Sequence, residues 1–165
     1  MSRKHQVLLG LSAAEVRERI QSLSGHQPEI QSTVVVVDPI HVPLVASSLD
    51  TSATVAAVAG YPTGRHHTLI KASESRLAFQ SGAQEIWVSV DNTVTDSNAH
   101  LSDLVAVREA CPEPVRLGLI LPRQAATASH HAGVEEAFRA AAQAAALAGF
   151  DILISPVGPD SQKNT

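Results

Sequence analysis

Short apolar runs alternate with longer amphipathic runs along almost the whole of this 165-residue chain. The clearest apolar run is Thr33–Val37, in which four valines follow the threonine. A continuous β-branched run of this kind is typical of a strand that is buried on both faces. Strict alternation of such strands with helices favours a parallel sheet with right-handed crossovers. The pattern therefore predicts an α/β fold and argues against all-helical and all-β folds.

Capping and turn residues set the predicted bounds of these elements. Ser12 and Glu15 have the spacing of a capping box, and Gly25, Gly82 and Gly149 each follow the end of an amphipathic run. We predict strands over residues 7–11, 33–37, 53–59, 85–90, 115–121 and 150–155. We predict helices over residues 13–23, 42–48, 68–81, 100–110 and 134–147.

Composition narrows the classes of protein to which the chain can belong. The formal net charge is −4, which offers no basic surface for nucleic acid or for a membrane. No apolar run approaches the roughly 20 residues of a membrane span. The single cysteine, Cys111, excludes an internal disulfide, and we expect a cytoplasmic protein. Residues 1–158 are expected to form one β/α domain, and residues 159–165 a disordered polar tail.

Residues 55–92 carry the most specific motifs. These are the turn Gly60-Tyr-Pro-Thr-Gly64, the helix with Thr68, Lys71 and Glu74, and the strand approach Gly82-Ala-Gln-Glu-Ile86. The segment resembles the deoxyribose-phosphate aldolase family at its third and fourth strands. That family has a Gly-Phe-Pro-x-Gly turn, a Thr-x-x-Lys-x-x-Glu helix and a Gly-Ala-x-Glu-Ile/Val-Asp strand. Residues 33–39 and 148–151 resemble the family's second strand and the start of its sixth, so the resemblance covers most of the chain.

The resemblance implies a TIM-type (β/α)8 barrel of which this sequence carries about six strands. We therefore expect an incomplete barrel, with parallel strands inside and helices outside. The last two strands of the family pattern are missing, and with them its phosphate-gripping loops and a second active-site lysine. The unpaired edge strands of an open parallel sheet can pair with strands of another chain. We expect a homo-oligomer, pairing with a full-length paralogue, or a shift of the first and last strands that closes the gap.

The resemblance also places the family's chemistry on particular residues. A class I aldolase needs a lysine whose neutral amine attacks a carbonyl, together with a group that moves protons. The family's Schiff-base lysine corresponds to Ile154, its strand-four aspartate to Trp87, and its strand-five lysine to Arg116. Ile154 has no nucleophilic atom, Trp87 donates a hydrogen bond but relays no proton, and Arg116 keeps only the charge.

We therefore expect an aldolase homologue without Schiff-base activity, which is either a binding or regulatory pseudoenzyme or a degenerate remnant. An active carbon–carbon lyase that acts on deoxyribose 5-phosphate or a related sugar phosphate is the alternative. The chain has three lysines, and Lys4 and Lys163 lie in its terminal segments. Lys71 lies on the third long helix, where we expect a surface charge with Glu74 as its helical partner.

Polar residues at the predicted strand ends are the candidates for a ligand cleft, because loops after strands form the active face of a β/α barrel. The candidates are Asp38, Tyr61, Asp91, Arg116 and Ser155. We expect them to bind a sugar phosphate without a cofactor.

Histidines in the predicted loops suggest a third alternative, a metal-dependent enzyme. They are His41, His66, His67, His130 and His131. Their spacing matches no known metal signature, so the favoured interpretation is that they are polar loop residues.

Overall fold

The computed structural model describes residues 3–24, 33–49, 53–121 and 131–154. The elements in chain order are β1 (Lys4–Leu8), α1 (Ala13–Ser24), β2 (Thr33–Val37), η1 (Pro39–His41), α3 (Val42–Ser48), β3 (Thr54–Ala59), α4 (Thr68–Gln80), β4 (Glu85–Val88), α5 (Ser97–Ala110), β5 (Arg116–Ile120), α6 (His131–Leu147) and β6 (Ile152–Ile154). The strand–helix alternation predicted from the sequence is therefore confirmed. The predicted tail over residues 159–165 lies outside the described residues.

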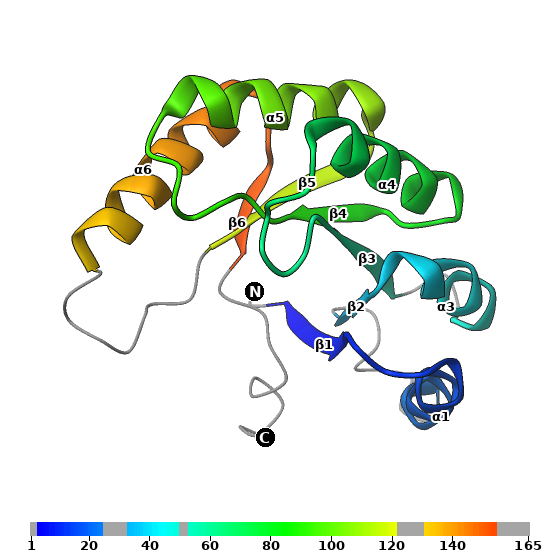
Figure 1. Cartoon of the computed structure of the whole chain (residues 1–165). Coiled ribbons are helices and arrows are strands. Elements are labelled where there is room, and N and C mark those ends of the chain that lie inside the picture. Colours follow the sequence, from blue (N-terminus) through cyan, green and yellow to red (C-terminus); the bar gives the residue numbers. More distant parts are fainter. Residues whose placement is uncertain (1–2, 25–32, 50–52, 122–130, 155–165) are drawn as a thin grey trace.

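All six strands belong to one parallel sheet, in the order β1-β2-β3-β4-β5-β6. The sheet curves, and the helices lie along its outer side (Figure 1). Since β1 and β6 stand at the two ends of the strand order, the described part of the sheet is not closed. The predicted incomplete TIM-type barrel is confirmed, and the described strands do not show the shift of the first and last strands that would close it.

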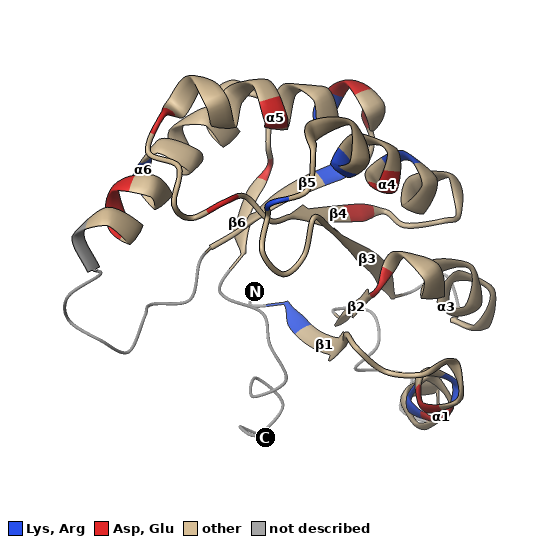
Figure 2. Cartoon of the chain, in the orientation of Figure 1, with Lys and Arg blue, Asp and Glu red and all other residues tan. Residues whose placement is uncertain are grey.

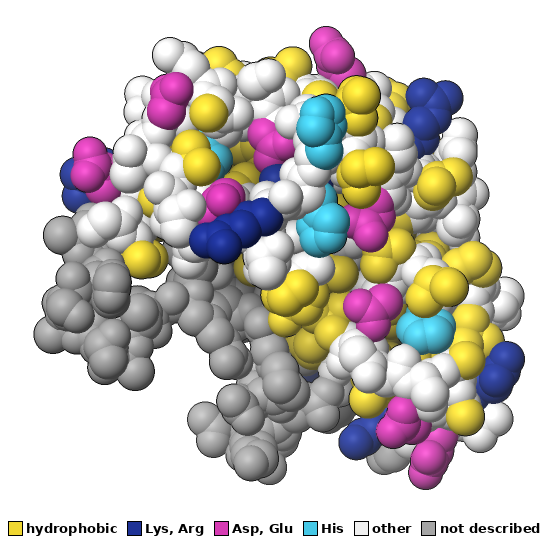
Figure 3. Space-filling model, viewed as in Figure 1, with side chains coloured by type: hydrophobic (Ala, Val, Ile, Leu, Met, Phe, Trp, Pro, Cys, Tyr) yellow, Lys and Arg dark blue, Asp and Glu magenta, His cyan; other side chains and the backbone are white. Residues whose placement is uncertain are grey.

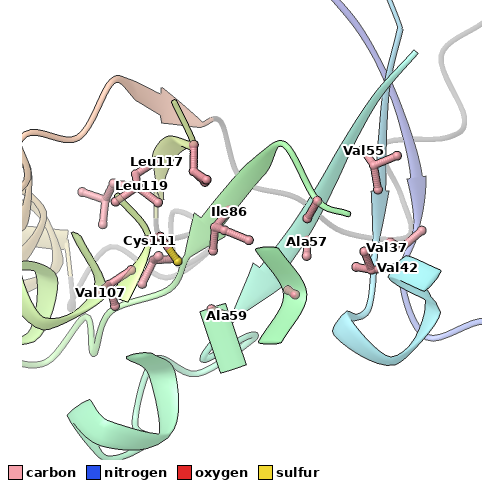
Figure 4. Close-up of a cluster of buried hydrophobic side chains, with 14 of the residues drawn as sticks. Val37, Val42, Val55, Ala57, Ala59, Ile86, Val107, Cys111, Leu117 and Leu119 are labelled. Carbon is pink, nitrogen blue, oxygen red and sulfur yellow. The ribbon is translucent and has the colours of Figure 1, made fainter. Parts of the chain in front are cut away.

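The two faces of the sheet contribute to two different hydrophobic clusters. On β2, Val35 and Val37 face the helices, whereas Val34 and Val36 face the inner side of the curve. Figure 4 shows part of the outer cluster, in which side chains of β2 to β5 meet residues of α5 and its end, such as Val107 and Cys111. Strands that are buried on both faces explain why the valine run shows no polar alternation.

The helices cover this outer cluster with one face each, and α1, α4, α5 and α6 also carry charged residues, whereas α3 has none (Figure 2). Charged side chains lie among hydrophobic ones on the surface of this side of the molecule (Figure 3). Helix α1 buries Val16 and Ile20, and α5 buries Leu104 and Val107. The backbone N–H of Ser12 donates to Glu15 Oε2 at 2.8 Å, which confirms the capping box. None of the helices in the described part of the chain is long and apolar enough to cross a membrane.

Three elements begin three residues earlier than predicted, and one of them is α6, which begins at His131 rather than at residue 134. Helix α5 begins at Ser97 rather than His100, because the Asp96 side chain accepts a hydrogen bond from the Asn98 N–H at 2.9 Å and caps the helix. Strand β1 occupies Lys4–Leu8 rather than residues 7–11, because its five residues pair in register with Thr33–Val37 of β2. Polar residues at the start of β1 hid this pairing from the sequence pattern.

Candidate functional site

Three of the predicted cleft residues share the edge of the sheet at which the strands end. Asp38 follows β2, Tyr61 follows β3 and Asp91 follows β4. Because the strands are parallel, their carboxyl ends meet at one edge, which is the active face of β/α barrels. Arg116 is the first residue of β5 and therefore lies at the opposite edge. Ser155 lies outside the described residues.

A tryptophan occupies the middle of the inner face. Strand register places Trp87 between Val58 of β3 and Gly118 of β5, and the indole is fully buried. A Cβ atom added at Gly118 would lie 3.1 Å from Trp87 Cδ1 and 2.9 Å from Ile154 Cγ1. The absence of a side chain at Gly118 therefore provides the room that the indole and Ile154 fill. Trp87 and Ile154, the residues onto which the sequence resemblance places the family's catalytic aspartate and lysine, pack in the same inner cluster.

Beneath the indole lies a buried carboxylate that sequence reasoning missed. Glu85 is 1% exposed, and its Oε2 accepts a hydrogen bond from Trp87 Nε1 at 3.1 Å. Its Oε1 forms ion pairs with Arg3 at 2.6 Å and with Arg116 at 3.3 Å. Arg116 is thus engaged below Trp87 and does not line the carboxyl-end cleft. The only signal in the sequence is a charged residue that opens the otherwise apolar strand Glu85–Val88.

The imidazole of His5 adds an aromatic contact to this group. Its ring lies edge-on to Trp87, with ring centroids 5.0 Å apart. Partial burial and the neighbouring Arg3 guanidinium lower the pKa of His5 below its ordinary value, although Glu85 acts in the opposite direction. The folded protein therefore favours neutral His5.

The loop after β3 contacts both α4 and the segment that follows β4. The Gly60 N–H donates to Glu74 Oε2 on α4 at 2.8 Å, and the Gly64 N–H donates to the Gly60 carbonyl at 2.8 Å. Gly64 has a φ of 69°, and a Cβ atom there would lie 2.1 Å from the Val90 carbonyl carbon. Only glycine fits this close approach. The result is a rigid turn that packs Tyr61 against the inner cluster and confirms the predicted turn.

Lys71 does not have the surface position predicted for it. Its side chain is 2% exposed, and Nζ forms an ion pair with Asp103 Oδ2 of α5 at 2.5 Å. Thr68 Oγ1 donates to the other Asp103 oxygen at 2.9 Å. The expected partner, Glu74, instead accepts from Gly60. The prediction was wrong because Asp103, 32 residues away in sequence, provides a partly buried counter-charge between the helices.

The carboxylates of Asp91 and Asp38, at the carboxyl-end edge of the sheet, differ in the hydrogen bonds and ion pairs that they already make. Asp91 Oδ1 accepts from the Thr93 N–H at 2.9 Å and from Thr93 Oγ1 at 2.6 Å, and Oδ2 pairs with Arg65 at 3.2 Å. Burial alone would raise the pKa of Asp91, but the Thr93 hydrogen bonds and the Arg65 charge hold that pKa below its ordinary value. Asp38 Oδ2 accepts a hydrogen bond from the Gly10 N–H at 2.7 Å.

Ser89 is a further polar residue at this edge that sequence reasoning missed. Its neighbours Val88 and Val90 pack in the outer cluster, so the alternation of a strand turns Ser89 to the inner side. The side chain is 4% exposed, and its Oγ has no hydrogen-bond partner among the described residues. Buried hydroxyls are nearly always paired, so this unpaired oxygen requires an explanation.

The loop histidines do not converge in the described part of the chain. His41 Nε2 lies 3.0 Å from the Leu11 carbonyl oxygen, and His67 Nδ1 accepts from the Leu69 N–H at 3.2 Å as the cap of α4. His66 is exposed. His130 and the side chain of His131 lie outside what the structure describes. Within the described residues, no three His, Cys, Asp or Glu side chains are placed to hold a metal ion together.

Comparison with known proteins identifies relatives of the chain. It is 37% identical to a deoxyribose-phosphate aldolase of Corynebacterium jeikeium over 151 residues, which are 86% of this chain and 58% of that protein. It is 41% identical to the deoxyribose-phosphate aldolase of Corynebacterium glutamicum over 118 residues, 70% of this chain and 50% of that protein. The chain thus spans little more than half the length of these relatives.

The structural comparison agrees with the sequence comparison about the fold. A putative deoxyribose-phosphate aldolase from Coccidioides immitis superposes with a TM-score of 0.74 at 22% sequence identity. The superposition covers 95% of this chain and 59% of that structure. No family model matches the chain.

Proposed function

Because this chain is a homologue of the deoxyribose-phosphate aldolases, we propose that it binds deoxyribose 5-phosphate or a related sugar without forming a Schiff base. The observation that carries the proposal is the inner face of β4 and β6. Where the resemblance places the family's aspartate and lysine, this chain has Trp87 and Ile154, and both are buried in an apolar cluster. Neither side chain can attack a carbonyl or move a proton at neutral pH.

The remaining lysines support the same proposal. The Lys71 ammonium is held by Asp103 between α4 and α5, on the outer side of the sheet. Lys4 opens β1 and so lies at the edge opposite the carboxyl-end cleft. A Schiff base needs a neutral amine within reach of the bound carbonyl, and neither position meets this requirement. Lys163 lies outside the described residues.

The test is a retro-aldol assay on deoxyribose 5-phosphate, with borohydride added in parallel and the intact protein mass recorded. We expect no turnover and no mass increase, together with a saturable shift of the unfolding temperature by the sugar phosphate. Lys4→Arg and Lys71→Arg are the matched variants, because each keeps the charge but removes the amine that forms a Schiff base.

A trapped adduct would contradict the proposal and support the active carbon–carbon lyase. Loss of the adduct in one arginine variant would then identify the lysine. Absence of any binding would instead favour a degenerate remnant. Stoichiometric zinc in the purified protein would revive the metal-dependent alternative that the loop histidines suggested.

The proposal extends to a partner that covers the open side of the sheet, either a second copy of this chain or a full-length paralogue. Both end strands of the sheet lack a second neighbour among the described strands, and Leu153 of β6 is 53% exposed. Unpaired parallel edges bind further strands. Light scattering at micromolar concentration should give a mass above that of one chain, whereas a monomer would count against the partner.

We also place the protein in the cytoplasm under this proposal. Support comes from the lone cysteine, Cys111, which is buried and free. Burial raises the pKa of its thiol to about 11, so little reactive thiolate forms at neutral pH. Cell fractionation would test the location directly.

A further inference from the structure

Ser89 lies in the layer of inner-face side chains just above the indole of Trp87. Its backbone N–H donates to the Ala59 carbonyl, and Val88 pairs with Leu119 of β5, so Ser89 lies beside Ile120. Ile120 pairs in turn with Ile154 of β6. The hydroxyl of Ser89 therefore stands in an otherwise apolar layer, 4% exposed and without a partner among the described residues.

The surroundings of Ser89 restrict what its hydroxyl could bind. Trp87 lies below it and is fully buried, and the partly buried Tyr61 packs against the same inner cluster. Asp38 directly follows Val37 of β2, two strands from β4, which corresponds to about 10 Å at the usual strand spacing. Its carboxylate accepts hydrogen bonds but repels an anion.

The Arg65 guanidinium, the cation described at this edge, is already paired with Asp91. Arg3 and Arg116 both pair with Glu85, beneath Trp87. A phosphate would therefore meet no unpaired arginine among these residues, and Asp38 would repel it. Hydroxyl groups, in contrast, can donate to Asp38 and exchange hydrogen bonds with Ser89, while the CH surface of a sugar can pack on the partly buried Tyr61 ring.

We propose that Ser89 and Asp38 bind the hydroxyl groups of a small neutral sugar at the carboxyl-end edge of the sheet, next to Tyr61. The inference deepens the proposed function and rests on it: the sugar moiety supplies the recognition, and a phosphate adds little. The unpaired Ser89 oxygen is then a polar group that the ligand satisfies.

The experiment titrates the full chain with 2-deoxyribose, with deoxyribose 5-phosphate and with inorganic phosphate, using ligand-observed NMR. The variants are Ser89→Ala and, as a matched control, Ser73→Ala on the exposed surface of α4. We expect the two sugars to bind with affinities within about threefold of each other. Loss of one hydrogen bond worth about 1 kcal/mol should weaken binding about fivefold in Ser89→Ala, and Ser73→Ala should bind like the wild type.

A second measurement separates a ligand contact from a structural role. Because Ser89→Ala removes an unsatisfied buried oxygen, its urea midpoint should equal or exceed that of the wild type. Wild-type sugar binding that Ser89→Ala leaves unchanged would overturn this inference but leave the proposed function intact. Binding of only the phosphorylated sugar would overturn the neutral-sugar assignment. Absence of binding by the wild type to either sugar would overturn both proposals.

Discussion

Replacing Gly118 by alanine should destabilise this protein only while Trp87 is present. A Cβ atom at position 118 would lie 3.1 Å from Trp87 Cδ1 and 2.9 Å from Ile154 Cγ1, both closer than normal contact. Overpacking of a core typically costs about 1–3 kcal/mol. Removing glycine from a strand returns about 0.5–1 kcal/mol. The free energy of unfolding should therefore fall by about 1–2 kcal/mol in Gly118→Ala.

The second half of this double-mutant cycle repeats Gly118→Ala in a variant that lacks the indole. Trp87→Leu should cost about 3 kcal/mol by itself, because it empties a fully buried site and removes the hydrogen bond to Glu85. In that background the new Cβ no longer meets the indole, and the side chains of Ile154 and Ile152, whose Cγ1 atoms would lie 2.9 Å and 3.2 Å from it, can move into the volume that the indole leaves. The cost of Gly118→Ala should then fall to about zero, which gives a coupling energy of about 1 kcal/mol or more.

The assay is urea unfolding followed by far-UV circular dichroism. Fluorescence is unsuitable, because Trp87 is the only tryptophan of the chain and half of the variants lack it. The urea transitions of the wild type, the two single variants and the double variant are compared. Where the slope m of the transition is the same, a difference in urea midpoint reports a difference in the free energy of unfolding. If Gly118→Ala costs the same with and without the indole, to within about 0.5 kcal/mol, the packing argument is refuted.

Three further predictions follow from the described contacts. Lys71→Met leaves the partly buried Asp103 without its counter-charge and should lower the free energy of unfolding by about 2–3 kcal/mol, measured in urea. If Lys71 were the exposed surface charge first predicted, the loss would stay below about 0.5 kcal/mol. Folding lowers the pKa of His5 below its ordinary value of 6.5, so the unfolded chain takes up a proton at a higher pH than the folded protein does. The stability that neutral His5 contributes is therefore fully present above pH 6.5 and is lost as the pH falls from 6.5 to the pKa of the folded state. The wild-type urea midpoint should therefore drop more steeply between about pH 7 and about pH 5.5 than that of His5→Phe, and parallel curves would contradict this. Because the pKa of Cys111 is raised to about 11 and the residue is buried, a thiol reagent should react slowly with native protein and fast in denaturant. Equal rates would show that the thiol is accessible.

The elements that local signals determine could be predicted from the sequence. Strand Thr33–Val37 and helix Val42–Ser48 were predicted residue for residue, because a β-branched run and a Pro-containing stop between them leave little choice. The start of β1 was missed, because Lys4, His5 and Gln6 carry no strand pattern of their own. They are a strand because β2 supplies a partner of matching length.

The candidate site could be predicted only in part, for the same physical reason. The carboxyl-end positions of Asp38, Tyr61 and Asp91 follow from the strand ends alone. Which hydrogen bonds these groups already make depends on residues that are distant in sequence, such as Gly10, 28 positions before Asp38. The unpaired Ser89 oxygen depends on every neighbour at once, so no local pattern could reveal it.

The period of two along the strands explains how the proposed function is compatible with the resemblance to an aldolase. Alternate residues such as Ile86 and Val88 pack against the helices, while Glu85 and Trp87 face inward. The outer set and the helices form the larger of the two hydrophobic clusters, and they hold the fold together. The inward-facing residues can change with little effect on the outer cluster, provided that their side chains still fill the inner space without clashes. Gly118, which leaves room for the Trp87 indole, is an example. Overall identity to an aldolase therefore does not establish the chemistry, which must be judged from the inner face residue by residue.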